Sequence, residues 1–341
     1  MDLTTGYFWL DTAIKVALAL AVMLGLALPV IYAELKVMAH MQNRVGPYYA
    51  GGRYGWAQPI ADGLKFLQKE DLVPRDADST VYKAAPYIVV MATFAVFVVI
   101  PLGPDVVVRD MDLGIFYLLA ISSVGVLGVL MAGWASANKY SLMGGLRAAG
   151  QLIAYELPLI LAALAVVIQA GTMSLVGIVE VQGDALFTIG SVEISLPYIL
   201  TGQIVSFIIF IIAMVAELSR IPFDMPIAES ELTMGYITEY SSIRFAMFFL
   251  GEYASLVALS LVVATLFLGG YWVPFVSDDW LNLIGPFVVL TKAAVIIFFV
   301  LWIRSTFPRL REDQLQNLAW RWLIPLALVN ILVISFVKVA V

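Results

Sequence analysis

Eight apolar runs divide this chain, each of about 18 or more residues, which is the length that a helix needs to cross a lipid bilayer. Hydrophobic residues make up 62% of the sequence, more than the core of a soluble protein requires. The sequence therefore predicts an all-α, polytopic membrane protein with eight transmembrane helices in a single integral membrane domain, residues 1–341. The runs lie near residues 12–33, 85–102, 113–136, 152–176, 199–217, 245–269, 284–304 and 322–341.

The sequence offers few residues that hold a metal or a redox cofactor. It contains no cysteine and a single histidine, His40, whereas haem, iron–sulfur clusters and thiolate zinc sites rely on these residue types. A GxGxxG or Walker-type glycine loop is also absent from it. We therefore expect no metal site and no cofactor bound covalently or by metal ligation in this chain. We also expect no nucleic acid among its partners. Any electrons used in redox chemistry must be carried by other molecules.

Lysine and arginine residues alternate between the seven connections that join the apolar runs. The connections hold 7, 1, 2, 0, 2, 0 and 4 of them, so 15 lie in odd-numbered connections and 1 lies in the even-numbered ones. Short connections that are rich in basic residues stay in the cytoplasm. The pattern therefore predicts that the odd-numbered connections are cytoplasmic and that both termini lie on the periplasmic or extracellular side.

The long first connection contains an amphipathic stretch at residues 55–70. At 100° per residue, Trp56, Ile60, Leu64 and Leu67 fall on one stripe, and polar side chains fall on the opposite one. Such a stretch is expected to form a helix that lies on the membrane surface. Its apolar face is either a structural anchor or the entrance for a lipid-like molecule.

The fifth connection, residues 218–244, is acidic although apolar runs flank it. Its only basic residues are Arg220 and Arg244. Carboxylates held close together repel one another, so some of them bind protons at a higher pH than a free carboxyl group does. We interpret this connection as a proton-binding cluster, and the alternative is a solvated acidic loop. The acidic residues in or beside it are Glu217, Asp224, Glu229, Glu231 and Glu239, of which Glu229 and Glu231 would share a face if the chain is extended there.

Two further carboxyl groups fall inside apolar runs. Glu156 lies a few residues into the fourth run, and Glu252 lies roughly 12 Å into the bilayer, counted from Arg244. A charged side chain at the bilayer centre costs about 2.5–3.5 kcal/mol on insertion scales, so both carboxyl groups should face protein or water. Both are candidate proton sites. The alternatives are a helix cap at Glu156 and a structural hydrogen bond at Glu252.

Four stretches, read together, resemble one family. They are QNRVGP with GWAQPIADGLKFLQKED, then GGLRAAGQLIAYEL, then AELSRIPFDMPIAESELTMGYITEYSSIRFAMFFLGEY, and finally PRLREDQLQNLAW. The chain is similar to the H membrane subunit of proton-pumping NADH:quinone oxidoreductase, respiratory complex I, whose mitochondrial equivalent is called subunit 1. The match is specific, because it includes long polar loops that hydropathy alone does not determine.

The resemblance implies a subunit that docks the hydrophilic electron-transfer arm on the membrane arm of this complex, in a prokaryotic cell (inner) membrane. Its implied partners are the hydrophilic quinone-module subunits, small membrane subunits that lead to antiporter-like subunits, and membrane lipids. Ubiquinone or menaquinone would be the substrate. NADH, flavin and iron–sulfur clusters would be bound by partner subunits, so this chain would belong to an enzyme without holding a redox centre.

The resemblance also implies roles for individual residues. The surface helix and the acidic connection would line a quinone tunnel, and the carboxylates would begin the polar path that carries the redox signal towards the antiporter-like subunits. For Arg304, contact with lipid phosphates is the alternative. The quinone-binding residues would be Trp56, Ile60, Asp62, Lys65, Arg220, Phe223, Asp224, Glu229, Glu231 and Arg304. The proton-relay residues would be Glu156, Glu217, Glu239 and Glu252.

The chain departs from the family pattern at two places. Where the family usually has Glu-Arg-Lys after its first span, this chain has Glu34, Leu35 and Lys36. Where the family usually has Pro-Glu-Ala-Glu, this chain has Pro-Ile-Ala-Glu at residues 226–229. One arginine and one carboxylate are therefore missing near the expected quinone head group and proton path.

Other functions are open to a chain with this pattern. The nearest alternative is the equivalent membrane anchor of a coenzyme F420 dehydrogenase or of a membrane-bound hydrogenase, and the subunits that copurify with the chain would distinguish them. A free-standing ion-coupled transporter is an alternative of a different class. Transporters of that kind usually contain internal repeats with broken helices, and the two halves of this sequence show no such similarity.

The alternation of basic residues predicts the topology directly. Tags at Met1 and Val341 should both be accessible from outside the cell, and a tag within residues 218–244 should be accessible only from the cytoplasm. Accessibility is measured with a membrane-impermeant reagent on intact and on opened cells. A cytoplasmic terminus would contradict the eight predicted spans.

Overall fold

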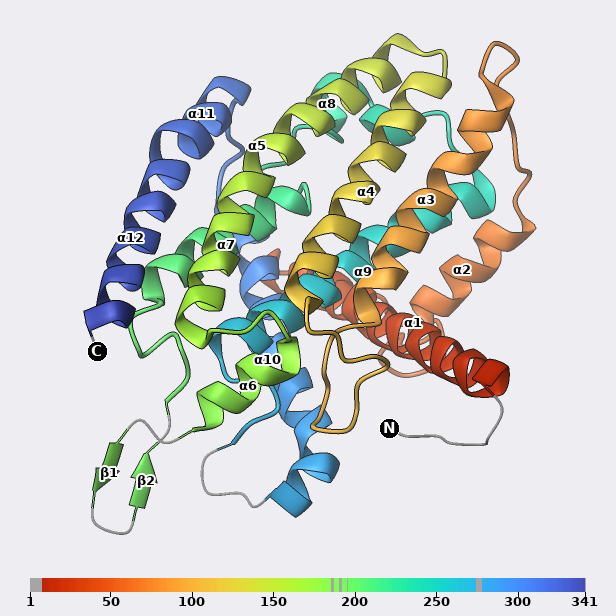
Figure 1. Ribbon diagram of the computed structural model, residues 1–341. Coiled ribbons are helices and arrows are strands. Elements are labelled where there is room, and N and C mark those ends of the chain that lie inside the picture. The colour runs from red at the N-terminus through yellow and green to blue at the C-terminus, as the bar shows by residue number, and fades with distance from the viewer. Residues whose placement is uncertain (1–7, 185–186, 190–191, 195, 274–277, 341) are drawn as a thin grey trace.

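Long helices make up most of the chain that the computed structural model describes, namely residues 8–184, 187–189, 192–194, 196–273 and 278–340 (Figure 1). Seven helical stretches in this part are long and apolar enough to cross a membrane. The all-α class and the polytopic fold predicted from the sequence are therefore confirmed. Six of these stretches are the helices α1 (Phe8–Met41), α3 (Ser79–Phe97), α4 (Gly114–Ala135), α5 (Lys139–Ala170), α9 (Ser242–Phe267) and α10 (Asp278–Thr306). The seventh is the continuous helical stretch Glu312–Ala340, which ends with α12 (Ile324–Ala340).

The fifth predicted span is a shorter apolar helix, α7 (Ile204–Glu217). Its 14 residues extend about 21 Å at 1.5 Å per residue, whereas the hydrocarbon core of a bilayer is about 30 Å thick. The half of α7 nearest Glu217 is enclosed by protein, since Ala213, Met214 and Ala216 are completely buried. This helix therefore relies on its neighbours more than on lipid.

Smaller elements join the long helices. The surface helix expected at residues 55–70 is present as α2 (Gln58–Gln68). On the opposite side of the bundle, α6 (Leu175–Gly183) precedes a hairpin of two short antiparallel strands, β1 (Phe187–Ile189) and β2 (Val192–Ile194) (Figure 1). The remaining elements are α8 (Glu229–Leu232), the 3₁₀-helix η1 (Gly235–Ile237), α11 (Glu312–Asn317) and the π-helix η2 (Leu318–Leu323).

Two helices differ from the simple apolar runs for identifiable reasons. Helix α5 begins at Lys139, well before the apolar run at residue 152, because the side chain of Asn138 accepts a hydrogen bond from Tyr140 N and caps the helix. Before α12, the wider π-helical turn of η2 precedes Pro325. Proline lacks an N–H group and crowds the preceding turn of a helix, and a π-turn is a usual way to accommodate such a break.

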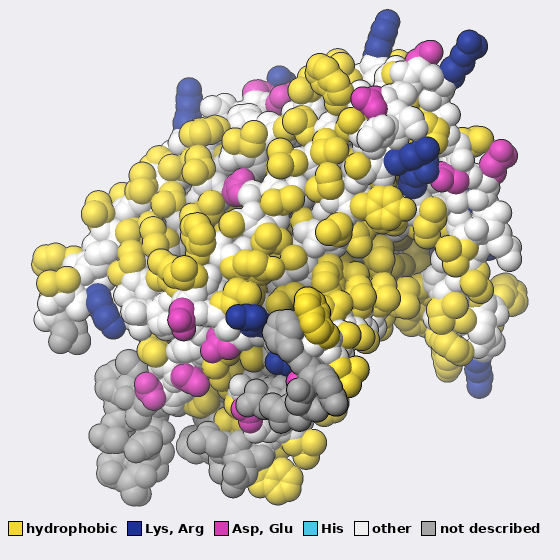
Figure 2. Space-filling model, turned by 45° about the vertical axis from the view of Figure 1, so that its right-hand side comes forward, with side chains coloured by type: hydrophobic (Ala, Val, Ile, Leu, Met, Phe, Trp, Pro, Cys, Tyr) yellow, Lys and Arg dark blue, Asp and Glu magenta, His cyan; other side chains and the backbone are white. Residues whose placement is uncertain are grey.

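The core of the bundle is centred on α9, which contacts α1, α3, α7 and α10. Almost every side chain of α9 from Leu256 to Phe267 is buried. The outward faces of the other helices are apolar as well, so hydrophobic side chains cover most of the face seen in Figure 2 and charged groups lie mainly at its edges. A chain with apolar side chains both inside and outside is suited to a lipid environment. It is a multi-pass membrane protein.

Candidate functional site

The connection between α7 and α9 is fixed against α5 at several points. Gly235 has φ +57°, and a Cβ atom there would overlap the carbonyl oxygen of Pro226. A Cβ atom at Gly144 of α5 would lie only 2.7 Å from Gly235 Cα. Glycine is favoured at both positions, because one needs a left-handed backbone and both need a close approach. Gln151 of α5 also donates a hydrogen bond to Phe223 O at 2.8 Å. The charged residues of this connection are therefore held in defined places.

Four charged side chains meet where α1, α9 and α10 face this connection, and we call them the buried charge cluster. Glu34 of α1 forms ion pairs with both Arg220 and Arg304. Arg220 Nη2 also lies 3.0 Å from Glu252 Oε1. The side chains of Arg220 and Glu34 are only 2% and 7% exposed. Each charge therefore depends on its partners, because an unpaired ion in a protein interior costs several kcal/mol.

The buried charge cluster borders a cavity of about 730 Å³, which we call the outer cavity. Its polar lining includes Arg220, Asp224 and Arg304, and Phe245 and Phe249 contribute to its apolar lining. Phe245 also packs against Phe66 of α2, with ring centroids 5.3 Å apart. The outer cavity thus lies between the buried cations and the surface helix.

A second cavity, of about 120 Å³, lies among α3, α4, α5, α7 and α9, and we call it the inner cavity. Its polar lining includes Glu217, Thr93 and Ser255. The hydroxyl oxygens of Thr93 and Ser255 are 3.1 Å apart. Glu217 Oε2 is buried and has no hydrogen-bond partner within the described part of the chain. The space is large enough for several water molecules, which typically occupy cavities with such polar groups.

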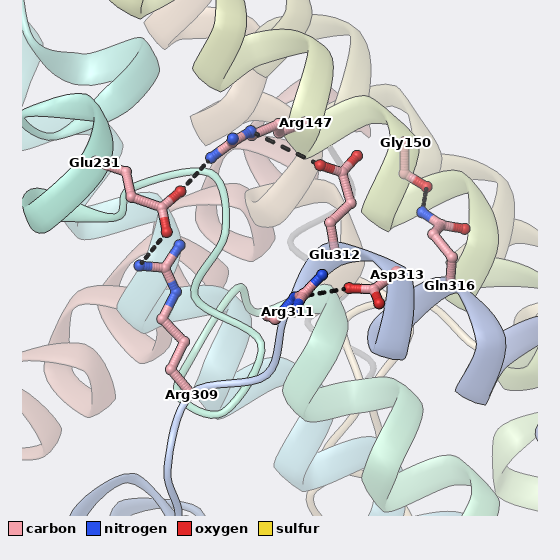
Figure 3. Close-up of polar contacts among 8 residues, drawn as sticks. All are labelled: Arg147, Gly150, Glu231, Arg309, Arg311, Glu312, Asp313 and Gln316. Carbon is pink, nitrogen blue, oxygen red and sulfur yellow. Dashed lines mark hydrogen bonds and ion pairs between the residues drawn. The ribbon is translucent and has the colours of Figure 1, made fainter.

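A network of exposed charges joins α5, α8 and α11 at the end of the bundle where these helices meet (Figure 3). Glu231 accepts a hydrogen bond from Arg147 Nη1 at 2.7 Å and lies 3.5 Å from Arg309 Nη1. The Nε atom of Arg147 lies 3.9 Å from Glu312 Oε2. The hydrogen bond from Arg147, together with the charge of Arg309, holds the pKa of Glu231 below its usual range. The contact stabilises the folded protein at pH values above about 4.3, the ordinary carboxyl pKa. This stabilisation is lost as the pH falls from there through the lowered pKa of Glu231.

The residues predicted on the surface helix lie apart from the buried charge cluster. Trp56, which precedes the first residue of α2, and Ile60 are 60% and 48% exposed, so the predicted apolar stripe is open to its surroundings. Asp62 and Lys65 form an ion pair of 3.2 Å with each other on the polar side. Leu35, which replaces the family's arginine, lines a surface groove beside Asp62. Position 35 therefore faces this groove and not the buried charge cluster.

The prediction of one carboxylate cluster in the acidic connection is wrong for the side chains that the structure describes. Glu231 contacts arginines, and Glu239 Oε1 accepts a hydrogen bond from Asn138 at 2.5 Å. Glu217 has Glu156 of α5 as a carboxylate neighbour, and Asp224 has Glu252 of α9. Glu229 begins the helical turn α8 instead of an extended segment, and its side chain lies outside the described part. The connection brings each glutamate to a separate partner, so repulsion within the set is mostly avoided.

Two of the predicted quinone residues differ in their surroundings. Asp224 lines the outer cavity, as expected for a residue near a quinone. Phe223 instead packs in the core, where it is 5% exposed and its ring centroid lies 5.3 Å from that of Tyr155. The reason is the hydrogen bond from Gln151 to Phe223 O, which holds this residue against α5.

Sequence reasoning missed the residue at the centre of the buried charge cluster, Glu34. It also missed Tyr253, whose ring lies 4.6 Å from the Arg220 guanidinium carbon, and the hydroxyl pair of Thr93 and Ser255. For Glu34 a signal was present, because it is an acidic residue at the inner end of the first apolar run. Thr93 and Ser255 are inconspicuous in sequence, since hydroxyl residues in membrane helices commonly bond to their own backbone.

Side chains that could ligate a metal ion do not gather in the described residues. Within them, no group of three or more histidine, cysteine, aspartate or glutamate side chains is arranged to hold such an ion. The carboxylates near the cavities have arginine, amide or single carboxylate neighbours instead.

Replacing Glu34 by glutamine should destabilise the protein more than any exposed charge substitution. The variant leaves Arg220 and Arg304 without their shared carboxylate, and breaking a buried ion pair costs about 3–5 kcal/mol. The matched control is Asp62→Asn, which removes the carboxylate of an exposed pair worth about 0–1 kcal/mol. The unfolding temperature of the purified complex measures the difference. Equal unfolding temperatures for the two variants would show that Glu34 does not hold the cluster together.

Comparisons with known proteins identify the family of this chain. The family model described as NADH dehydrogenase matches residues 14–335. The H subunit of NADH-quinone oxidoreductase from Geobacillus kaustophilus is 45% identical over 322 residues, which cover 94% of this chain and 92% of that protein. The H 2 subunit of NADH-quinone oxidoreductase from Syntrophobacter fumaroxidans is 46% identical over 343 residues, which cover 98% and 97%. The chain therefore belongs to the NADH dehydrogenase family, as an H subunit of the membrane-bound NADH-quinone oxidoreductase complex.

Proposed function

We propose that this chain forms much of the quinone tunnel of its complex and links quinone reduction to proton movement. The observation that carries the proposal is the outer cavity, which combines an apolar wall at Phe245 and Phe249 with cationic groups at Arg220 and Arg304. A quinone has an apolar isoprenoid tail and a head with two carbonyl oxygens. Arginine N–H groups donate to such oxygens, and the aromatic wall suits the tail.

The surface helix α2 would form the entrance of the tunnel. Its exposed stripe, which contains Trp56 and Ile60, is suited to the boundary between lipid head groups and tails. The helix is fixed to the start of α9, because Ser242 Oγ donates towards Lys69 O at 2.7 Å and Arg244 lies 3.0 Å from Asp71. The Phe66 and Phe245 rings then lead from this helix to the outer cavity. A tail could therefore remain in apolar surroundings along this path.

Electrons would reach the quinone from partner subunits. NADH, flavin and iron–sulfur clusters are assigned to the hydrophilic subunits of the complex, because this sequence contains no cysteine to hold a cluster. The exposed charges around Arg147, Glu231 and Glu312 (Figure 3) offer those subunits a polar docking surface on the cytoplasmic side. The apolar outer faces of the bundle would contact lipid and the small membrane subunits that lead to the antiporter-like ones (Figure 2). Both termini, which lie outside the described residues, are assigned to the opposite side.

The proton relay would use the carboxyl groups nearest the two cavities. Glu252 is paired with Arg220, so a change of charge in the outer cavity alters its environment directly. Glu217 lines the inner cavity and has Glu156 as its neighbour. Two nearby carboxylates couple their titrations, so protonation of one favours ionisation of the other. Glu239 is bonded to Asn138 at the edge of α5 and would take part less directly.

A photoreactive quinone analogue should label two segments of this chain in the assembled complex. We expect labels in α2 near Trp56 and in the outer-cavity lining near Phe249, because the tail and the head of one molecule contact them at different depths. Peptide mapping by mass spectrometry identifies the labelled residues, and an excess of unlabelled quinone should suppress both labels. Labelling confined to the connections on the opposite side, such as residues 171–203, would exclude the proposed tunnel.

Replacing Glu217 by glutamine tests the relay. Glutamine keeps the shape and much of the hydrogen bonding but cannot titrate, so the complex should assemble while quinone reduction and proton uptake fall by about tenfold or more, as expected for an essential proton-transfer group. The measurement is NADH-driven quinone reduction with proton uptake in proteoliposomes. Glu180→Gln, at an exposed position of α6 that lines neither cavity, is the control and should change neither rate. Full activity of Glu217→Gln, with an unchanged number of protons taken up per quinone reduced, would contradict the proposed relay.

A further inference from the structure

The outer and inner cavities meet at a wall of three residues. Ser219, Ile227 and Glu252 each line both cavities. All three belong to the connection that follows α7 or to α9, which is packed against it. A direct exchange of water or protons between the two cavities passes this wall.

Glu252 is the only titratable member of the wall within the described part of the chain. Towards the outer cavity, its Oε1 atom lies 3.0 Å from Arg220 Nη2, and Asp224 and Arg304 line the same cavity. Towards the inner cavity, it shares the lining with Glu217 and Ser255. A single carboxyl group therefore has access to a cationic site on one side and to a polar, water-sized space on the other.

Ile227 gives the same wall an apolar side chain at a fixed position. Its neighbours in sequence, Pro226 and Ala228, are buried. The carbonyl of Pro226 is held so close to Gly235 that no Cβ atom fits between them, which restricts how far residue 227 can move. A water molecule beside an isoleucine side chain loses hydrogen bonds, so an apolar constriction interrupts a file of water.

We propose that Ile227 is an apolar partition between the two cavities, and that a proton crosses from one to the other only on the carboxyl group of Glu252. This inference rests on the proposed function of the cavities. It assigns Ile227 a positioning role, because the side chain touches neither quinone head nor proton but directs the proton through one group. The partition also gives a reason for an isoleucine at a place where the resembling family usually has a carboxylate.

The proposed transfer is balanced at each step. A quinone takes up two electrons, supplied from NADH through the partner subunits, and two protons to become a quinol. Protonated Glu252 gives one proton to an acceptor in the outer cavity and becomes a carboxylate, which Arg220 holds at 3.0 Å. A proton from the inner cavity, passed on by water near Glu217 and the Thr93–Ser255 hydroxyl pair, then neutralises Glu252 again. Each transfer therefore removes one proton from the inner cavity.

The test combines two substitutions. Glu252→Gln removes the group that carries the proton, and Ile227→Asn makes the partition permeable to water. In the assembled complex, Glu252→Gln should lower NADH-driven quinone reduction by about tenfold, which corresponds to about 1.4 kcal/mol. Adding Ile227→Asn should restore a large part of that loss, because water then connects the cavities and the carboxyl group is bypassed. Ile227→Leu, which keeps an apolar side chain of the same size, is the matched control and should restore nothing. If the effects of the two substitutions on the rate of quinone reduction are not additive, residues 227 and 252 act on the same proton transfer.

Ile227→Asn alone supplies a second readout. Quinone reduction should persist, while the number of protons moved per electron in proteoliposomes falls by about half or more, since protons exchange without charging Glu252. If this variant does not assemble, Ile227→Thr replaces it, because threonine keeps the branched shape and adds a hydroxyl group. No rescue of Glu252→Gln and an unchanged proton ratio would overturn the partition. An unimpaired Glu217→Gln variant would instead overturn the relay, so the two failures are distinguishable.

Discussion

The pairing of Glu34 with two arginines is the interaction on which the rest of the site depends. It joins α1, α10 and the connection after α7, three segments that are far apart in sequence. A buried guanidinium group requires a carboxylate partner, so the position of Arg220 fixes where α1 can lie. Arg220 in turn determines the place of Glu252 on α9. The positions of Arg220, Arg304 and Glu252 at the outer cavity therefore depend on one carboxylate of the first helix.

Much of the fold could be predicted from the sequence because hydropathy acts locally. Each apolar run marks a helix, and the stripe through Trp56 and Leu67 correctly indicated the surface helix α2. Helix ends were less predictable. The start of α5 at Lys139 depends on a cap at Asn138, and no hydropathy window detects a single hydrogen bond. The length of α7 likewise depends on how its neighbours enclose it.

The site was only partly predictable, because its partners come from distant segments. Arg220, Asp224, Glu252 and Arg304 could be chosen as charged residues in or beside apolar runs, and the structure brings them to one cavity. Spacing in the sequence could not show that Glu231 would pair with Arg147 and Arg309, whereas Glu239 would bond to Asn138. Phe223 illustrates the same limit. An aromatic residue beside a functional arginine can face either the cavity or the core, and only its packing on Tyr155 decides between them.

The short length of α7 also determines how the protein responds to its membrane. A helix that is shorter than the hydrocarbon layer normally thins the bilayer around it. The end of α7 that carries Glu217 is surrounded by protein, since the residues from Ile209 to Ala216 are buried apart from the half-buried Ile212. Lipids of different acyl-chain length therefore do not reach this end. The depth of the Glu217 carboxyl group is set by the protein, and a cell can change its lipid composition with temperature without moving it.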